Sequence, residues 1–275
     1  MASTQDDTVR PDQRLILALG GHEFSRRRGN SAIRDYMLAL AAAERPRICL
    51  LPTASGDPEE QIVAFRRAMG DLPCELSHVS LFRLEHERVR LEQHLQSQDL
   101  IYVGGGSMVN LVAIWRAHGL DVILRRAWER GVVLAGQSAG AMCWFEHGIT
   151  RSGGSATVAA GLGLVPGILS VHYERDPDRR RALVRAVSDR NTLGYGVADQ
   201  AGILIRGATA AAAVSGRREA GVWRVEPNGD GAREIRLSPA PLPDPQPAID
   251  EVAEEVDELR RVRALRARTR GGRTQ

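Results

Sequence analysis

The chain has 275 residues, of which 43% are hydrophobic, and this is enough for one substantial α/β core with an appended segment. The net charge is only +3 and aromatic residues make up 4%, with no basic stripe interleaved with aromatic side chains, so the composition disfavours nucleic-acid binding. All 37 basic residues are arginine, and the absence of lysine from the sequence excludes a Ser-Lys dyad or a lysine Schiff base.

The sequence carries no targeting or membrane signal that we can identify. No stretch of about 18 apolar residues occurs, and residues 1–7 lack the basic and apolar regions of a signal peptide. We therefore expect a cytoplasmic protein that does not bind membranes. Cys49, Cys74 and Cys143 are far apart and have apolar neighbours, which predicts buried free thiols with neither a disulfide framework nor a zinc site. We expect no metal and no cofactor.

The first half of the chain alternates short apolar runs with helical patterns. The runs are continuous, end at turn residues and cover 15–19, 48–51, 100–103 and 132–135. Amphipathic segments lie between them at 31–43, 58–69 and 110–118. This alternation predicts an α/β fold in which a doubly wound, mostly parallel sheet has helices on both faces.

The second half adds strands and then changes in composition. Further strands are predicted at 168–171, 202–205, 211–214 and 222–225, the last of them an edge strand. We divide the chain into a disordered N-terminus (1–13), an α/β domain (14–236), a Pro-rich linker (237–247), a helix (248–268) and a disordered tail (269–275). The helix has one apolar face, which predicts packing on its own domain or on a second subunit of a homodimer.

A serine between two glycines follows the fourth apolar run. In Gly136-Gln137-Ser138-Ala139-Gly140, the spacing G-x-S-x-G is typical of a nucleophile elbow, which exposes a serine hydroxyl at a sharp strand-to-helix turn. The amide after the serine can then stabilise an oxyanion, so the motif indicates acyl transfer. An ordinary turn in a Gly/Ala-rich loop remains the alternative.

A serine nucleophile needs a base, and the position of each histidine helps to choose it. His172 comes 34 residues after Ser138, at the end of a predicted strand, and active sites form at the carboxyl ends of parallel strands. His147 is closer in sequence but is expected on a helix or loop that points away, and His22 is a further candidate for the same cleft. Helical or surface positions are predicted for the other histidines, which are His78, His86, His94 and His118.

Four blocks of sequence resemble the peptidase E family of α-aspartyl dipeptidases, which is related to the cyanophycinases. They are Tyr102–Gly106, Gly136–Ala141, Gly161–Gly167 and His172-Tyr173, within a similarity that runs from about residue 14 to 226. The resemblance implies a serine hydrolase on a class I glutamine-amidotransferase-like fold that cleaves small peptides without a metal. The Pro-rich linker and the last helix lie outside it.

The resemblance also implies roles for individual residues. Ser138 becomes the nucleophile and His172 the general base, while an oxyanion would face the amides of Ala139 and of either Gly105 or Gly106. The glycine triplet alone is equally typical of a tight turn or a phosphate loop. However, no G-K-[ST] sequence or G-x-G-x-x-G spacing follows to support nucleotide binding.

Two positions depart from the family pattern. Ser107 stands where members commonly have asparagine, which shortens a side chain near the oxyanion or the substrate. The acid that should orient His172 is absent from residues 150–154, so Glu146 is our assignment, with Asp199 after another predicted strand as the alternative. Loss of this acid would weaken the base and leave the oxyanion hole intact, which favours a second hypothesis, a catalytically inactive binding protein that retains the fold.

The substrate is predicted to be a short peptide, for example an Asp-X dipeptide. Arginine can clamp a substrate carboxylate, and Arg175 is assigned this role, with Arg151 and Arg179 also near the site in sequence. A solvated helix face is the simpler explanation for Arg179 and the neighbouring Arg180 and Arg181. An acyl-transfer enzyme of a dedicated pathway is the alternative function.

Two other reactions are disfavoured by the order of residues. Glutamine amidotransfer uses cysteine where Ser138 stands, and Cys143 comes five residues too late. An α/β-hydrolase esterase usually places its histidine near the end of the chain, after a separate acid.

Overall fold

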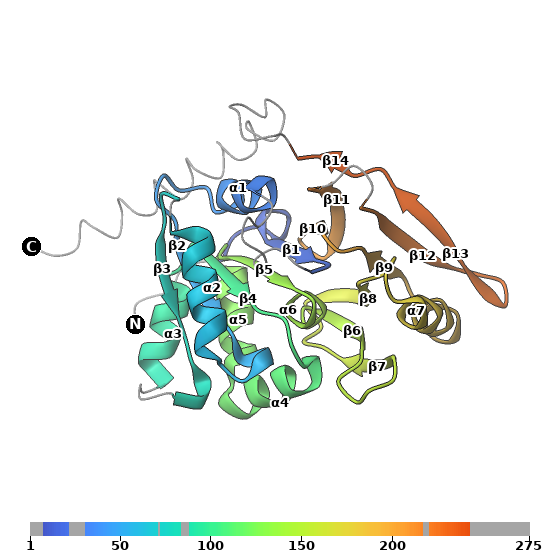
Figure 1. Ribbon diagram of the computed structural model, residues 1–275, viewed down its shortest axis with the longest axis horizontal. Coiled ribbons are helices and arrows are strands. Elements are labelled where there is room, and N and C mark those ends of the chain that lie inside the picture. The colour runs from blue at the N-terminus through green and yellow to red at the C-terminus, as the bar shows by residue number, and fades with distance from the viewer. Residues whose placement is uncertain (1–7, 22–30, 71, 84–87, 217–219, 243–275) are drawn as a thin grey trace, which may run out of the picture.

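The computed structural model describes residues 8–21, 31–70, 72–83, 88–216 and 220–242. The predicted helix at 248–268, the tail at 269–275 and the last residues of the Pro-rich linker lie outside these ranges, as do His22 and His86. Two sheets and the helices around them make up the described part of the chain (Figure 1).

An eight-stranded sheet contains the strands expected from the apolar runs. Its order is β14-β11-β10-β1-β5-β4-β2-β3. Five adjacent strands of this sheet run parallel to one another: β1 (Leu15–Leu19), β5 (Val133–Gln137), β4 (Leu100–Val103), β2 (Arg47–Leu51) and β3 (Glu75–His78). On the other side of β1, β10 (Ala201–Arg206) and β11 (Thr209–Ser215) are antiparallel to their neighbours, and β14 (Ala240–Pro241) runs parallel to β11.

Helices cover both faces of this sheet because alternate side chains of each strand point to opposite faces. On β1, Leu15, Leu17 and Leu19 pack with α1 (Ser31–Leu40) and α2 (Glu59–Met69). Ile16 and Ala18 belong to the core on the other face, which is covered by α3 (Arg88–Gln96), α4 (Met108–His118) and α5 (Leu120–Glu129). The expected α/β fold with helices on both faces is therefore confirmed.

A second, six-stranded sheet was not expected. Its order is β13 (Gly231–Leu237), β12 (Val222–Asn228), β9 (Gly194–Val197), β8 (Val165–Val171), β6 (Phe145–Thr150) and β7 (Thr157–Ala160). The helix α7 (Pro177–Arg190) packs on it through Leu183 and Val187. The predicted edge strand at 222–225 is thus an inner strand, because β13 forms a hairpin with it and takes the edge.

Short segments connect these parts. The four-residue helix α6 (Ala139–Met142) links β5 of the first sheet to β6 of the second (Figure 1). The described residues also form the 3-10 helices η1 (Pro11–Gln13), η2 (Thr53–Ser55) and η3 (Leu81–Arg83). Val9 is buried and its amide donates to Glu129 O at 2.8 Å, so residues 8–13 are ordered in place of the disorder expected for them.

None of the helices within the described ranges combines the length and apolar character needed to cross a bilayer.

Candidate active site

Ser138 lies at a sharp turn between β5 and α6, in the conformation that the G-x-S-x-G motif predicts. Its backbone has φ 52° and ψ −114°, which is strained for a residue other than glycine. A Cβ at Gly136 would lie 2.3 Å from Gly140 O, and a Cβ at Gly140 would lie 2.3 Å from Val103 O. Only glycine fits at both positions, and the turn is further held by a hydrogen bond from the Ser138 amide to Leu19 O at 3.1 Å.

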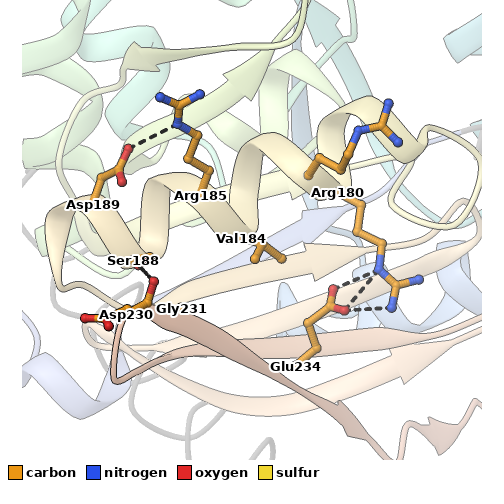
Figure 2. Close-up of a pocket in the computed structure, with 9 residues that line it drawn as sticks. Arg180, Val184, Arg185, Ser188, Asp189, Asp230, Gly231 and Glu234 are labelled. Carbon is orange, nitrogen blue, oxygen red and sulfur yellow. Dashed lines mark hydrogen bonds and ion pairs between the residues drawn. The ribbon is translucent and has the colours of Figure 1, made fainter.

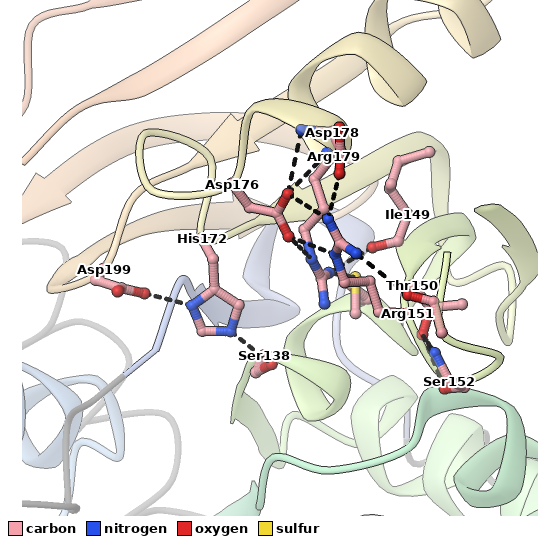
Figure 3. Close-up of polar contacts among 12 residues, drawn as sticks. Ser138, Ile149, Thr150, Arg151, Ser152, His172, Asp176, Asp178, Arg179 and Asp199 are labelled. Atoms are coloured by element: carbon pink, nitrogen blue, oxygen red, sulfur yellow. Dashed lines mark hydrogen bonds and ion pairs between the residues drawn. The ribbon is translucent and has the colours of Figure 1, made fainter. Parts of the chain in front are cut away.

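The hydroxyl of Ser138 contacts the imidazole of His172. The distance from Ser138 Oγ to His172 Nε2 is 3.0 Å (Figure 3). His172 follows the last residue of β8 and has φ 55°, which turns its side chain back toward the elbow. At this distance, Nε2 can accept the hydroxyl proton when the oxygen attacks a carbonyl carbon.

The other imidazole nitrogen contacts a carboxylate, that of Asp199. His172 Nδ1 and Asp199 Oδ1 form a hydrogen bond, and the two side chains are 25% and 20% exposed (Figure 3). Asp199 comes shortly after β9, which runs parallel to β8 with Val197 opposite Val171. Parallel strands end at the same edge of a sheet, so the residues after them meet. The three side chains have the connectivity of a Ser-His-Asp triad.

Glu146, our assignment for the acid, lies elsewhere. It is exposed on β6, and its Oε2 accepts a hydrogen bond from the Gly167 amide at 2.8 Å. Both residues are near the beginnings of their strands, and β6 is parallel to β8, so Glu146 is at the edge opposite to His172. The structure therefore places Asp199, the alternative, against His172.

Two glycines at the end of β1 allow the chain to pass close to this histidine and its carboxylate. A Cβ at Gly20 would lie 1.9 Å from Ala198 O. At Gly21, which has φ 151°, a Cβ would lie 2.5 Å from His172 Cε1 and 3.0 Å from Asp199 Oδ1. The sequence shows both glycines, but their contact with a loop almost 180 residues later depends on the pairing of β1 with β10.

The predicted oxyanion-hole residues lie beside Ser138. A Cβ at Gly105 would be 3.4 Å from Ser138 Cβ, so this glycine faces the nucleophile directly. Ala139 is the first residue of α6, whose N-terminal amides point toward the turn. Within the described residues, the amides of Gly105, Gly106 and Ala139 have no hydrogen-bond acceptor, so they are available to an oxyanion.

Ser107, which was expected near the substrate, caps the next helix. Its side chain accepts a hydrogen bond from Asn110 N at 3.3 Å at the N-terminus of α4. Its own amide donates to Ala54 O at 2.7 Å. Both contacts are structural, and serine is among the preferred residues at this helix position.

An open cleft of about 480 Å³ lies beside His172 and contains charged side chains on one wall. Arg151 Nε is 2.7 Å from Asp176 Oδ2, and Arg151 Nη2 is 2.7 Å from Asp178 Oδ2 (Figure 3). The hydrogen bond from Arg151 lowers the pKa of Asp176 to about 2. Asp176 also accepts amide hydrogen bonds at the N-terminus of α7, so it connects this helix to the end of β6.

The three candidate arginines differ in their exposure to solvent. Arg151 is held by two aspartates, and Arg179 is buried and donates to Ile149 O at 2.6 Å. The side chain of Arg175 is 72% exposed, with Nη1 3.6 Å from Asp199 Oδ2. Arg175 is therefore the arginine of this cleft that a substrate from solvent can reach most directly.

A second cavity, of about 460 Å³, lies between α7 and β13 (Figure 2). Two ion pairs lie within its lining: Arg180 Nη2 is 2.7 Å from Glu234 Oε2, and Arg185 Nε is 3.5 Å from Asp189 Oδ2. The lining contains no histidine or cysteine. We therefore assign the chemistry to the cleft beside His172.

The three cysteines and His147 do not contribute to the candidate active site. Cys49 and Cys143 are buried free thiols, whereas Cys74 is only half-buried, because it lies just before the edge strand β3. Burial raises the pKa of the Cys143 thiol well above its ordinary value, so the thiolate is disfavoured. His147 lies on the strand β6 in place of the expected helix or loop. In the described ranges, no three His, Cys, Asp or Glu side chains gather as metal ligands.

Comparisons with known proteins identify the family of the chain. The model of peptidase family S51 matches residues 16–213. The chain is 40% identical to the uncharacterized peptidase YgaJ of Bacillus subtilis over 229 residues, which cover 83% of this chain and 96% of that protein. It is 25% identical to a cyanophycinase of Nostoc sp. over 202 residues, covering 69% and 67% of the two chains.

Solved structures show the same fold. A peptidase from an acI-B1 Actinobacterium aligns with a TM-score of 0.64 at 19% identity, covering 82% of this chain and 94% of that one. A putative peptidase E protein from Listeria monocytogenes aligns with a TM-score of 0.55 at 17% identity, covering 74% and 98%. The family match and the relative from Bacillus subtilis together show that the chain belongs to peptidase family S51.

Proposed function

We propose that this protein is a serine peptidase that cleaves a short peptide through an acyl-enzyme on Ser138. The observation that carries the proposal is the continuous hydrogen-bonded series from Ser138 Oγ to His172 Nε2, at 3.0 Å, and from His172 Nδ1 to Asp199 Oδ1. This arrangement can activate a hydroxyl at neutral pH and fix the imidazole in the productive tautomer.

The reaction follows from the positions of these groups. Ser138 Oγ attacks the substrate carbonyl carbon while its proton passes to His172 Nε2, and the oxyanion is stabilised by the amides of Gly105 or Gly106 and Ala139. The tetrahedral intermediate collapses, the C–N bond breaks, and His172 gives its proton to the leaving amine. Water then attacks the ester carbonyl with His172 as base, which releases the acid and restores the serine.

For the substrate, we propose a short peptide with an N-terminal aspartate. The exposed guanidinium of Arg175 supports this, because it can bind a substrate carboxylate at the mouth of the cleft beside Asp199. Arg151 is a weaker candidate because Asp176 and Asp178 already neutralise it. The resemblance to α-aspartyl dipeptidases is the second support for this preference.

A test should separate the nucleophile from the substrate preference. A fluorophosphonate probe should label the wild type and fail to label Ser138→Ala, and no Ser138-dependent labelling would contradict the proposed peptidase. A panel of Asp-X and neutral dipeptides should then show faster cleavage of Asp-X. Arg175→Gln should raise KM for Asp-X at least severalfold while the probe still labels Ser138, whereas cleavage of neutral peptides alone would exclude the aspartyl preference.

The alternatives have less support. An inactive binding protein was motivated by a missing acid, and the contact of Asp199 with His172 removes that motive. An acyl-transfer enzyme would use the same acyl-enzyme with an amine in place of water. Adding an amine to the peptidase assay measures the partition: an amide product that outcompetes hydrolysis at millimolar amine would favour transfer.

A further inference from the structure

The glycine triplet that borders Ser138 is supported by the loop that follows β2. A Cβ at Gly106, which has φ 150°, would lie 2.2 Å from Ala54 O, so the two backbones are in direct contact. The same Ala54 oxygen accepts the amide of Ser107 at 2.7 Å. The η2 loop is itself anchored by a hydrogen bond from Trp115 Nε1 to Thr53 Oγ1 at 3.3 Å. The end of the triplet is therefore fixed by backbone contacts.

At the start of the triplet, the Gly104 amide donates a hydrogen bond to Leu51 O at 3.1 Å, and one side chain from α2 adds further support. A Cβ at Gly104 would lie 2.7 Å from Gln61 Oε1 and 2.8 Å from Gln61 Nε2, so the carboxamide occupies the space that a side chain at Gly104 would need. The hydroxyl of Ser55 donates to Gln61 Oε1 at 2.8 Å, which holds the carboxamide in this position. Gln61 thus links the η2 loop to the first glycine.

We propose that Gln61 is a positioning residue for the oxyanion hole, an inference that rests on the proposed function. Gly105 lies between Gly104 and Gly106, and its Cα faces Ser138. A glycine triplet has few conformational restraints of its own, because it has no side chains to pack. With Ala54 on one end and the Gln61 carboxamide on the other, the amide of Gly105 is held where the oxyanion forms.

The expected size of the effect follows from how Gln61 acts. Loss of an oxyanion donor lowers kcat by about 10²- to 10³-fold, whereas loosening a donor that remains present costs less. We expect Gln61→Ala to lower kcat by about tenfold, because the loop gains freedom before each reaction. KM should change little, since ground-state binding does not depend on the oxyanion contact.

The experiment uses two probes that need no knowledge of the natural substrate. The first is the second-order rate of labelling by a fluorophosphonate, whose phosphoryl oxygen enters the oxyanion hole as the bond to Ser138 forms. The second is kcat and KM for p-nitrophenyl acetate. The full chain carries Gln61→Ala, Gln61→Met or, as the matched control, Gln93→Ala on the exposed face of α3. Thermal midpoints are measured for each variant.

The outcomes separate this inference from the proposed function. We expect Gln61→Ala to react about tenfold more slowly with both probes, Gln61→Met to recover most of the rate by filling the same space, and Gln93→Ala to match the wild type. If the wild type shows no Ser138-dependent labelling, the proposed function fails. If the wild type reacts and Gln61→Ala reacts equally fast, Gln61 does not position the hole. A Gln61→Met variant as slow as Gln61→Ala would still support the positioning role and would assign it to the carboxamide that Ser55 holds.

Discussion

The eight-stranded and six-stranded sheets supply different parts of the candidate site. The larger sheet provides the nucleophile and its surroundings, since Ser138 follows β5 and the glycine triplet follows β4. The smaller sheet provides the base and the carboxylate, since His172 follows β8 and Asp199 comes after β9. Neither sheet alone carries a reactive serine, so the distance from Ser138 Oγ to His172 Nε2 depends on how the two sheets are held together.

The end of β1 holds them together. Leu19 O accepts the Ser138 amide, Gly20 packs against Ala198 O, and Gly21 packs against His172. The Gly21 oxygen also accepts the amide of Gln200 at 3.2 Å. The last residue of β1 and the two glycines that follow it therefore contact the loops that carry all three candidate catalytic side chains.

The largest effect should come from removing the carboxylate of the smaller sheet. Asp199→Asn should lower kcat by about 10²- to 10⁴-fold, because the amide does not stabilise the imidazolium and favours the wrong tautomer. The matched control is Glu146→Gln, whose side chain contacts only the opposite edge, and it should keep kcat within about threefold of the wild type. Steady-state kinetics on a cleaved dipeptide measures both. Equal losses in the two variants would contradict the assignment of Asp199.

A smaller effect should follow from disturbing the junction between the sheets. Gly21→Ala introduces a Cβ 2.5 Å from His172 Cε1, so the ring must move, and kcat should fall by about 10- to 100-fold. Gly229→Ala is the control, because this glycine also has a positive φ, 58°, but has no atom within 4 Å of the added Cβ. Gly229→Ala should lower the free energy of unfolding and leave kcat unchanged. If Gly21→Ala kept full kcat, the junction would not set the position of the histidine.

The strained backbone at Ser138, after β5 of the larger sheet, should lower the free energy of unfolding. Ser138 has φ 52°, which glycine adopts with less strain, so Ser138→Gly should lose activity and gain about 1 kcal/mol in the free energy of unfolding. Urea denaturation of Ser138→Gly and Ser138→Ala measures the difference, since alanine has the same backbone restriction as serine. A Ser138→Gly variant less stable than Ser138→Ala would show that the turn is not strained.

The smallest effect concerns the ion pairs in the smaller sheet. The pKa of Asp176 is lowered from its ordinary value of 3.8 to about 2, so the stabilisation by Arg151 is complete above about pH 4 and is lost as the pH falls from 3.8 toward 2. The thermal midpoint of Arg151→Gln should therefore be lower than that of the wild type at pH 7, and the gap should narrow below pH 4. Arg185→Gln, which breaks an exposed pair with Asp189, should show no such gap. If the difference in thermal midpoint between the wild type and Arg151→Gln stayed constant down to pH 2, the ion pair with Asp176 would not be its cause.

The parts of the fold that could be predicted are those with continuous apolar runs. The parallel strands β1, β2, β4 and β5 are buried on both faces, and the sequence marks them clearly. The strands β3, β7 and β13 lie at sheet edges and are only partly buried. Their polar residues interrupt the apolar pattern that predicts a strand. β6 was missed because Phe145–Thr150 mixes charged and apolar residues without a clear period.

The same reasoning explains the site. Ser138 and His172 were found because a turn motif and a strand end are local signals. The choice between Glu146 and Asp199 was not local: Glu146 is closer in sequence, but only the direction of β6 and the adjacency of β8 and β9 show which carboxylate reaches the imidazole. The support of the glycine triplet by Gln61 likewise depends on α2 packing over β4.

The pairing of β1 with β10 has a consequence for the synthesis of the chain. Leu15 is opposite Arg206, so the first strand is not fixed on that side until most of the domain has left the ribosome. Asp199 and the Gly21 contact also arrive only then. An unfinished chain has Ser138 without an oriented base, so we expect no activity during translation. In refolding experiments, activity should return late, after the larger sheet has formed.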